Sequence, residues 1–343
     1  MKIAIGPVLF DWNRETLNTF YRRMAFESAA DIIYIGEVVC SKRVGLGLDG
    51  LAQLLDEIIP SGKEIVLSSY GLVMHEGELE TIQALADMAR ERGLMLEAND
   101  MAAVGLHEGC AMVAGPHINT YNPETVDILK DMGARRAVFP VELPCNSIAS
   151  IIDGYRDYEQ EAAEAHDERE EGGEGDLSNE QKPFEFELFA HGRLPLTFSA
   201  RCYTARAFDL PKSDCHFKCG DYPDGMKVKT QDGVGFLTIN GVETMSDPLH
   251  NLIGHVDQIR QAGVDIVRLS PQQVAGADGA LLKAVKERGE TVTEHVAALW
   301  RRAIDGDLSA VDAVAMMNAL TPGVTFCNGY FLDQPGVSWI PPE

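Results

Sequence analysis

Three cysteines lie close together in one stretch of the sequence that also contains Pro and Gly. Cys202, Cys215 and Cys219 are spaced as C-x12-C-x3-C within RCYTARAFDLPKSDCHFKCGDYPDG. Closely spaced thiolates on a loop are what a tetrahedral zinc ion or an iron–sulfur cluster needs, because a loop can wrap around the centre. Three unrelated thiols are the simpler explanation, but their crowding favours a metal site. The spacing alone does not identify the metal.

Such a centre needs a fourth ligand, and the sequence offers two candidates. Cys40 follows a predicted strand at 31–36, which would place it in a loop at the C-terminal mouth of a barrel. His216 is the alternative, since it adjoins Cys215. The remaining cysteines are isolated, and we expect them to be small buried apolar side chains. They are Cys110, Cys145 and Cys327.

Polar side chains also gather where predicted strands end, which is the face on which barrel enzymes build their active sites. A general base among them is chemically feasible, but the sequence supplies no partner geometry with which to choose one. The catalytic residues therefore stay unassigned. The candidates are Glu37, Ser69, Asn99, Asp100, His117, Asn119, Glu142 and His191.

The segments that must position these residues alternate between strand and helix patterns in the first half of the chain. This alternation implies parallel strands joined by crossover helices. Eight such units fit the length, and no GxGxxG follows the first strand, so we expect a TIM-barrel-like (β/α) barrel. The predicted strands are 2–9, 31–36, 64–69, 94–98, 111–118 and 137–141, and the predicted helices are 13–25, 51–59, 78–92 and 123–132.

The second half is expected to complete one barrel-like domain over 1–335, with extra C-terminal elements, a cysteine-bearing loop and a tail at 336–343. Asn240–Gly241 is a strong hairpin signal between two short strands. The predicted strands are 184–189, 196–200, 236–239, 242–245 and 264–269, and the predicted helices are 249–261 and 292–305.

One segment, 157–181, interrupts the pattern with eleven acidic residues and one arginine. Because it has almost no apolar side chains to offset the entropy of ordering, we expect a solvated, mobile insertion. Within it, 159–171 could form a surface helix. A loop that only increases solubility is favoured over an acidic segment that docks on a specific partner.

The whole chain of 343 residues is strongly acidic, with 53 Asp and Glu against 29 Lys and Arg and a formal charge of −24. This charge argues against direct binding of nucleic acid or of anionic lipid headgroups. No apolar run approaches the roughly 20 residues of a membrane span, and the first residues turn polar too soon for a secretory signal. We therefore expect a cytoplasmic protein. Neither a GxSxG elbow, a P-loop nor an HExxH motif is present.

The stretch ELFAHGRLPLTFSARC, 187–202, resembles the signature of the collagenase-like "unclassified" peptidase family. Glu187, Phe189, Gly192 and Cys202 fit it. GEVVCSKR (36–43), HINTYN (117–122) and FPVELP (139–144) look like further landmarks, so the resemblance runs from residue 1 to about 335. Three positions depart from the signature, which has a small residue, a cysteine and a glycine where this chain has Arg193, Pro195 and Ala200.

Within that family, the chain resembles the members that act in oxygen-independent ubiquinone biosynthesis. The resemblance implies a four-iron–four-sulfur cluster on Cys40, Cys202, Cys215 and Cys219. It also implies a heterodimer with a paralogous chain, a lipid-binding accessory protein, a ubiquinone ring precursor as substrate and prephenate as a candidate hydroxyl donor.

Two alternatives stay open. The chain could be another hydroxylase of the family, acting on a tRNA base, or a peptidase, although no nucleophile and base for amide hydrolysis can be identified. It could instead be a metal-stabilised, non-catalytic scaffold for its partner. The acidic charge weighs against tRNA.

Overall fold

Eight parallel strands close into a barrel at the centre of the computed structural model, which describes residues 1–170, 183–273, 280, 283 and 287–342. The last barrel strand pairs with both the first and the seventh, which closes the ring and confirms the predicted TIM-barrel-like fold. The barrel strands are β1 (Lys2–Ile5), β2 (Ile32–Ile35), β3 (Glu64–Ser68), β4 (Met95–Ala98), β5 (Met112–Ala114), β6 (Ala134–Val138), β7 (Glu185–Phe198) and β11 (Ile266–Leu269).

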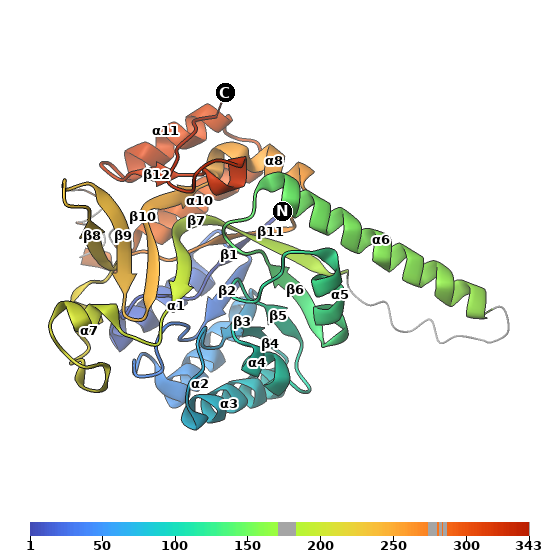
Figure 1. Ribbon diagram of the computed structural model, residues 1–343, viewed down its shortest axis with the longest axis horizontal. Helices are drawn as coiled ribbons and strands as arrows, with labels where there is room; N and C mark the ends of the chain where they lie inside the picture. Colours follow the sequence, from blue (N-terminus) through green and yellow to red (C-terminus); the bar gives the residue numbers. More distant parts are fainter. Residues whose placement is uncertain (171–182, 274–279, 281–282, 284–286, 343) are drawn as a thin grey trace.

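Helices surround this barrel (Figure 1), and local sequence sets several of their ends. Asn13 and Asn122 are N-caps, whose side chains accept hydrogen bonds from backbone N–H groups, and Gly93 ends a helix in the left-handed conformation. The helices around the barrel are α1 (Arg14–Phe26), α2 (Gly47–Ile58), α3 (Glu76–Arg92), α4 (Met101–Leu106), α5 (Pro123–Asp131), α6 (Cys145–Glu170), α8 (Val256–Gln261) and α10 (Val292–Ile304). No helix in the described ranges is both long enough and apolar enough to cross a membrane.

Strand β7 is longer than the sequence predicted, because most of 184–189 and of 196–200 lies in one continuous strand, Glu185–Phe198. Its first half pairs in parallel with β6 and β11, and its second half leaves the barrel and pairs antiparallel with β10 (Glu243–Asn251). The hairpin partner β9 (Gly235–Asn240) and then β8 (Met226–Lys229) extend this antiparallel sheet. The extension holds the cysteine-bearing segment against the barrel.

The predicted helix at 249–261 is wrong over its first half. Residues 249–251 continue β10, where Leu249 and His250 pair with the short strand β12 (Phe326–Cys327). Residues Ile253–His255 form a 3-10 turn, η4, and the α-helix begins at Val256. The apolar pattern was misleading because a buried strand and a helix segment look alike over so few residues. A second C-terminal helix, α11 (Ala310–Leu320), packs against α10.

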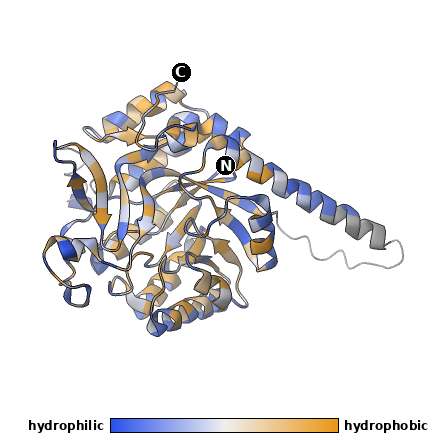
Figure 2. Ribbon diagram, in the orientation of Figure 1, coloured by the Kyte–Doolittle hydropathy of each residue, from blue (hydrophilic) through white to orange (hydrophobic). Residues whose placement is uncertain are grey.

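Helix α6 continues into the acidic segment as far as Glu170, and its projecting part is largely hydrophilic (Figure 2). It is tied to α5 by an ion pair between Lys130 and Glu159, with Nζ and Oε1 2.9 Å apart, and by a hydrogen bond from the Tyr158 hydroxyl to Glu124. Most of the helix expected at 159–171 is therefore present. Residues 171–181 of the acidic segment lie outside the described residues.

The interior of the barrel holds charged side chains rather than a purely apolar core. The Arg268 guanidinium lies 2.6 Å from Glu97 Oε1 and 2.5 Å from Glu187 Oε1, and all three side chains are buried. The Tyr34 hydroxyl donates to Glu187 Oε2 at 2.5 Å, and Arg136 donates to that hydroxyl at 3.0 Å. Buried charges are tolerated when each is paired, so the barrel depends on every member of this network.

Replacing Arg268 with Met should destabilise the fold by about 3–5 kcal/mol, because Glu97 would be left buried without its cation. The free energy of unfolding in guanidinium chloride measures this loss. The matched control is Arg22→Met, which removes an ion pair on the exposed surface of α1 and should change the unfolding midpoint little. Equal midpoints for the two variants would contradict the role of the internal network.

Candidate metal centre and adjoining pocket

Cys40 lies in the loop between β2 and α2, at the mouth of the barrel where the sequence placed it. Its backbone N–H donates to Glu37 Oε1 at 3.0 Å, and its carbonyl accepts from the N–H of Arg43 at 3.0 Å. The thiol is half-buried, and this burial raises its pKa. The loop is thus fixed by its own hydrogen bonds, with the thiol facing partly inward.

Cys202 begins α7 (Tyr203–Ala207), the short helix that follows β7. Its Sγ accepts a hydrogen bond from the backbone N–H of Ala205 at 3.4 Å, and the side chain is buried. The N–H of Tyr203 donates to the carbonyl of Gly241 at 2.9 Å, which attaches this end of the segment to the β9–β10 turn.

Cys215 directly follows the short 3-10 turn η2 (Lys212–Asp214), Cys219 lies within a second one, η3 (Lys218–Asp221), and both thiols are half-buried. Between them, His216 and Phe217 adopt left-handed backbone conformations with φ of 50° and 51°. Each such residue costs about 1–3 kcal/mol and is typical of ligand-binding turns. The chain is held in a strained turn between Cys215 and Cys219, two cysteines four positions apart whose sulfurs would face one centre.

The Cys219 thiol donates to Asp11 Oδ2 at 3.2 Å. Burial raises the pKa of this thiol to about 12, with Asp11 adding to the rise and Arg43 opposing it. His216, the alternative fourth ligand, has a ring that is 61% exposed and lies 3.7 Å from Asp214 Oδ1. This placement favours Cys40 over His216 as the fourth ligand.

Arg43 connects the loops that carry the cysteines. Its guanidinium, in a residue only 5% exposed, donates to the Leu9 carbonyl and to Asn240 Oδ1, both at 2.7 Å, and lies 3.4 Å from Glu37 Oε1. Although burial opposes its charge, Glu37 and the neighbouring Cys219 thiol raise the pKa of Arg43. The guanidinium therefore stays charged between the Cys40 loop and the Cys219 turn.

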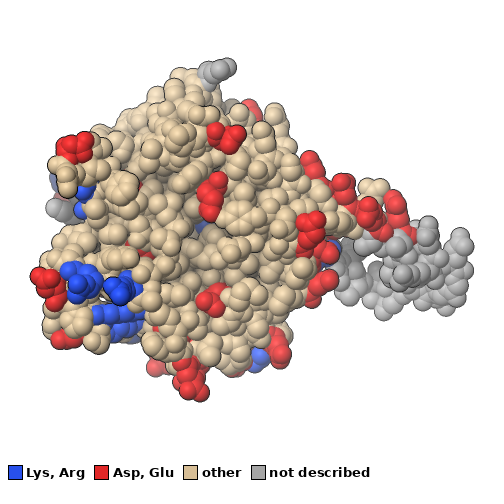
Figure 3. Space-filling view, in the orientation of Figure 1, with Lys and Arg blue, Asp and Glu red and all other residues tan. Residues whose placement is uncertain are grey.

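A second link joins the Cys40 loop to the turn before Cys215. Lys42 Nζ donates to the carbonyls of Lys212 and Ser213 at 2.7 and 2.8 Å. Exposed Arg201 and Arg206 lie on the same segment, and Figure 3 shows Lys and Arg side chains gathered over this part of an otherwise acidic and neutral face. The positive charge is concentrated where four thiolates would be.

The structure thus brings the loops of the four predicted ligands to one mouth of the barrel, and all four thiols are free. Within residues 1–170, 183–273 and 287–342, however, no three His, Cys, Asp or Glu side chains form a group that could hold a metal ion. The donor chemistry and the nearby cations fit a cluster bound by four thiolates. This agreement concerns the type of ligand and the position of the loops, because the sulfur atoms do not surround a common centre.

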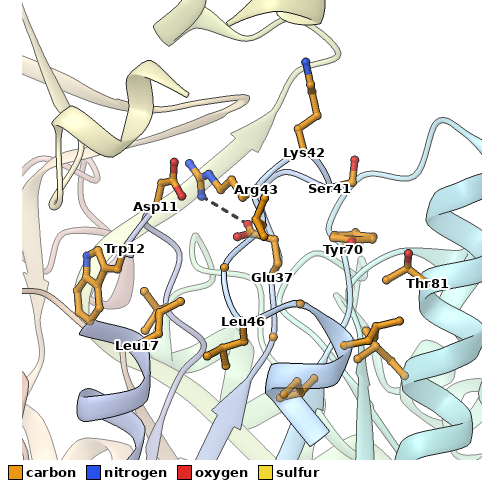
Figure 4. A pocket seen from close by; sticks show the side chains of 18 of the residues that line it. Asp11, Trp12, Leu17, Glu37, Ser41, Lys42, Arg43, Leu46, Tyr70 and Thr81 are labelled. Atoms are coloured by element: carbon orange, nitrogen blue, oxygen red, sulfur yellow. Dashed lines mark hydrogen bonds and ion pairs between the residues drawn. The ribbon is translucent and has the colours of Figure 1, made fainter. Parts of the chain in front are cut away.

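A cavity of about 330 Å³ adjoins these loops, between the β1–α1 and β2–α2 connections. Figure 4 shows Glu37 and Arg43 pointing toward each other at its polar side, with Trp12, Leu17 and Leu46 on its apolar side. Burial, partly offset by Arg43, raises the pKa of Glu37.

Of the eight polar strand-end candidates, only Glu37 lines this cavity. Four others lie inside or beside the barrel mouth near Arg268, where they are buried or have structural hydrogen bonds. Two of these four are histidines, and burial lowers the pKa of each to about 4. Asp100 is the N-cap of α4, and two candidates are exposed. The four are Ser69, Asn99, His117 and His191, and the exposed pair is Asn119 and Glu142.

Sequence reasoning missed Asp11, Trp12 and Arg43. Arg43 lies three positions after Cys40 within GEVVCSKR, and Asp11 and Trp12 lie just after the predicted strand 2–9. Their positions near a family landmark and near a strand end could therefore have marked them as candidates. The sequence does not show the contact between the β1–α1 connection and the turn η3, which brings Asp11 to Cys219 across 208 residues.

The family model described as Peptidase family U32 matches residues 18–339. Among solved structures, the U32 peptidase Mk0906 is similar at 9% identity and a TM-score of 0.40, over 79% of this chain and 93% of that chain. A tryptophan synthase complex from Pyrococcus furiosus is similar at 12% identity and a TM-score of 0.41, over 88% of this chain and 97% of that chain. Because these structures are only distantly similar, the assignment of a barrel is based on the strand pairing of this chain.

The mouth also contains Glu243, which is buried and accepts from Asn240 Nδ2 at 2.9 Å. Burial raises its pKa from 4.5 to about 8, despite that hydrogen bond and the nearby Arg43. Because the folded state holds this proton more tightly, the stability from this group is complete below pH 4.5 and is lost as the pH rises through 8.

Replacing Glu243 with Gln should remove this loss, so the variant should gain stability relative to the starting protein as the pH rises from 5 to 8. The difference in the free energy of unfolding between the variant and the starting protein should change by up to about 1.4 kcal/mol per pH unit. Unfolding midpoints in urea across that range measure it. Glu80→Gln, on the exposed side of α3, is the control and should follow the starting protein. A Glu243→Gln curve parallel to the control would contradict a neutral Glu243.

Proposed function

The chain belongs to peptidase family U32, and on that basis we propose that it is an iron–sulfur protein of oxygen-independent ubiquinone biosynthesis, a counterpart of the protein UbiV. The observation that carries this proposal is the convergence of the Cys40, Cys202, Cys215 and Cys219 loops at one mouth of the barrel, around the buried charge of Arg43. When bound, a four-iron–four-sulfur cluster on these thiolates supplies one-electron transfer, because it has no open iron position.

The chain's own residues would prepare the site for a negatively charged group. Arg43 lies within electrostatic reach of Cys40 and Cys219 and favours their thiolates, whose pKa values burial otherwise raises. Lys42 holds the Cys215 side against the Cys40 loop. The strained turn at His216 and Phe217 would keep two sulfurs near each other, at a cost that ligand binding can offset.

In the proposed pathway the chain works with a UbiU-like paralogue and a UbiT-like lipid-binding accessory protein. The ring precursor exchanges a C–H bond for a C–O bond, and a hydroxyl donor such as prephenate loses its C–O bond. The proton and the electron pair that the ring releases pass to the donor carbon, so atoms and electrons balance without molecular oxygen. The exchange needs electron transfer, which is the role proposed for the cysteine site.

The peptidase activity in the family's name is not part of this proposal. The usual nucleophilic pair for amide hydrolysis is a serine or cysteine that donates to a histidine ring, and the Cys219–Asp11 contact is assigned here to the cysteine site. Within the described chain, no serine hydroxyl or cysteine thiol has a hydrogen bond to a histidine ring, and buried His191 and His250 are held neutral by pKa values of about 4 and 3.

Protein purified without oxygen should contain about four irons and four acid-labile sulfides per chain. Changing Cys40, Cys202, Cys215 or Cys219 singly to Ser should lower both contents and, with the partner chain present, abolish ring hydroxylation. Cys110→Ser is the matched control, since Cys110 is an isolated half-buried thiol in the α4–β5 connection. It should leave the metal content unchanged.

Two results would contradict the proposal. One is zinc in place of iron, which would replace a redox centre with a structural one. The other is full iron and full hydroxylation in the Cys215→Ser and Cys219→Ser variants, which would place the metal elsewhere. Metal analysis and the visible spectrum of the same samples separate these results.

A further inference from the structure

The surface outside the cysteine-bearing segment differs in charge from the rest of the molecule. The whole chain has a formal charge of −24, but the segment 200–222 contains four Lys and Arg against three Asp and no Glu. Figure 3 shows Lys and Arg side chains gathered over this part, whereas Asp and Glu side chains are scattered over the rest of that face. An approaching protein would therefore meet a local positive surface on an acidic molecule.

Two of these positive charges have no role within the described chain. Arg201 and Arg206 are exposed, and neither forms an ion pair with another described residue. Lys218, by contrast, is paired with Asp221, with Nζ and Oδ2 3.0 Å apart. An exposed arginine without an ion pair is available to a partner, and arginine is enriched in protein–protein interfaces.

Three exposed aromatic side chains accompany these arginines. Tyr203 is 44% exposed, Phe208 is 39% exposed and Phe217 is 46% exposed. Single exposed apolar residues are normal on a protein surface, but a group of them indicates a site of interaction. Tyrosine and arginine are also the residue types that contribute most often to the binding energy of interfaces. The composition of this segment is therefore that of an interface.

Contacts between α7 and the turn η3 join these side chains into one surface. Lys218 Nζ lies 5.5 Å from the centroid of the Phe208 ring, and the ring centroids of Phe208 and Tyr222 are 6.4 Å apart. Tyr203 and Arg206 are three positions apart on α7 and so share one side of that helix. The surface is called here the aromatic–basic face, and it consists of Arg201, Tyr203, Arg206, Phe208 and Phe217.

The aromatic–basic face is built on the same segment as three of the four thiols. Cys202 is the N-cap of α7, and Cys215 and Cys219 lie on either side of Phe217 in the sequence. All three thiols are buried or half-buried. A protein on this face would be separated from them only by the side chains of the segment itself, and so short a path suits transfer of electrons.

The acidic charge of the whole chain selects among the negatively charged partners that this face could bind. At physiological ionic strength, exposed charges act over about 8 Å. A small acidic protein can contact the face alone, whereas an anionic membrane or a nucleic acid extends past it to the Asp and Glu side chains of the surrounding surface. Small interfaces are also typical of electron-transfer complexes.

We propose that the aromatic–basic face docks a small acidic electron-carrier protein, which delivers one electron to the cysteine site. The reduced carrier loses one electron and the cluster gains it, and no bond is made or broken. The electron transfer rests on the proposed function, because it needs the cluster. The docking itself rests on the unpaired arginines and the exposed rings of the face.

The test uses the full chain, purified without oxygen, and flavodoxin, a small acidic protein that carries FMN. Calorimetry should detect binding of flavodoxin but not of cytochrome c, a basic electron carrier. Raising the salt from about 20 to about 200 mM should weaken flavodoxin binding about tenfold, because exposed charges are screened. In stopped-flow mixing, the anionic FMN hydroquinone should lose one electron to the cluster and become the neutral semiquinone, whose absorption differs from that of the cluster.

Arg206→Glu should weaken flavodoxin binding and slow the electron transfer about tenfold, because a repulsive charge replaces an attractive one. Arg206→Gln, which only removes the charge, should cause a smaller loss of about threefold. The matched control is Arg156→Glu, the same change at an exposed position of α6, which lies far from α7 (Figure 1). It should bind flavodoxin as the starting protein does.

Three results would overturn the proposal: absent flavodoxin binding, equal binding by Arg206→Glu and Arg156→Glu, or binding of phosphatidylglycerol vesicles that Arg206→Glu abolishes. Iron is measured on the same samples. Iron present with flavodoxin binding absent or insensitive to Arg206→Glu contradicts the docking alone. Flavodoxin binding that depends on Arg206 in a chain without iron contradicts the cluster alone.

Discussion

The site at the barrel mouth depends on one buried positive charge. Arg43 is almost fully enclosed, and Leu9, Glu37 and Asn240 supply oxygen atoms to its guanidinium from three different parts of the chain. The contacts with Leu9 and Asn240 fix the β2–α2 loop against the β1–α1 connection and against the end of β9. Because Cys40 and Cys219 lie beside the same guanidinium, the contact that orders the loops also favours their thiolates.

The barrel makes this arrangement possible through the length of β7. A barrel strand would ordinarily end at the mouth, but β7 continues out of the ring and carries an antiparallel sheet. The chain between β7 and β8 then crosses back over the mouth and brings three cysteines to the loop that contains the fourth. Asp11 and Glu37, which line the cavity between the β1–α1 and β2–α2 connections, also contact Cys219 and the Cys40 backbone, so the cavity adjoins the proposed metal site.

Much of the barrel could be predicted from the sequence because its signals are local. Asn13, Asn122 and Gly93 mark helix ends within a few residues, and the Asn240–Gly241 turn marks the hairpin. The errors came where tertiary pairing decides. Residues 249–251 are strand because β12 lies beside them, and the gap predicted within β7 is absent because its two halves have different partners. Cys40 was predicted as a ligand from its position after a strand, whereas the contacts of Arg43 and Asp11 join segments far apart in the sequence.

The four thiols at this mouth are proposed to bind one iron–sulfur cluster beside Arg43. The decisive measurement is an anomalous difference map collected at the iron edge, on crystals grown from protein kept free of oxygen. One compact group of iron atoms bonded to Sγ of Cys40, Cys202, Cys215 and Cys219 is the expected result. Iron bound at other residues, or a fully iron-loaded chain in which these four sulfurs remain unbound, would contradict it.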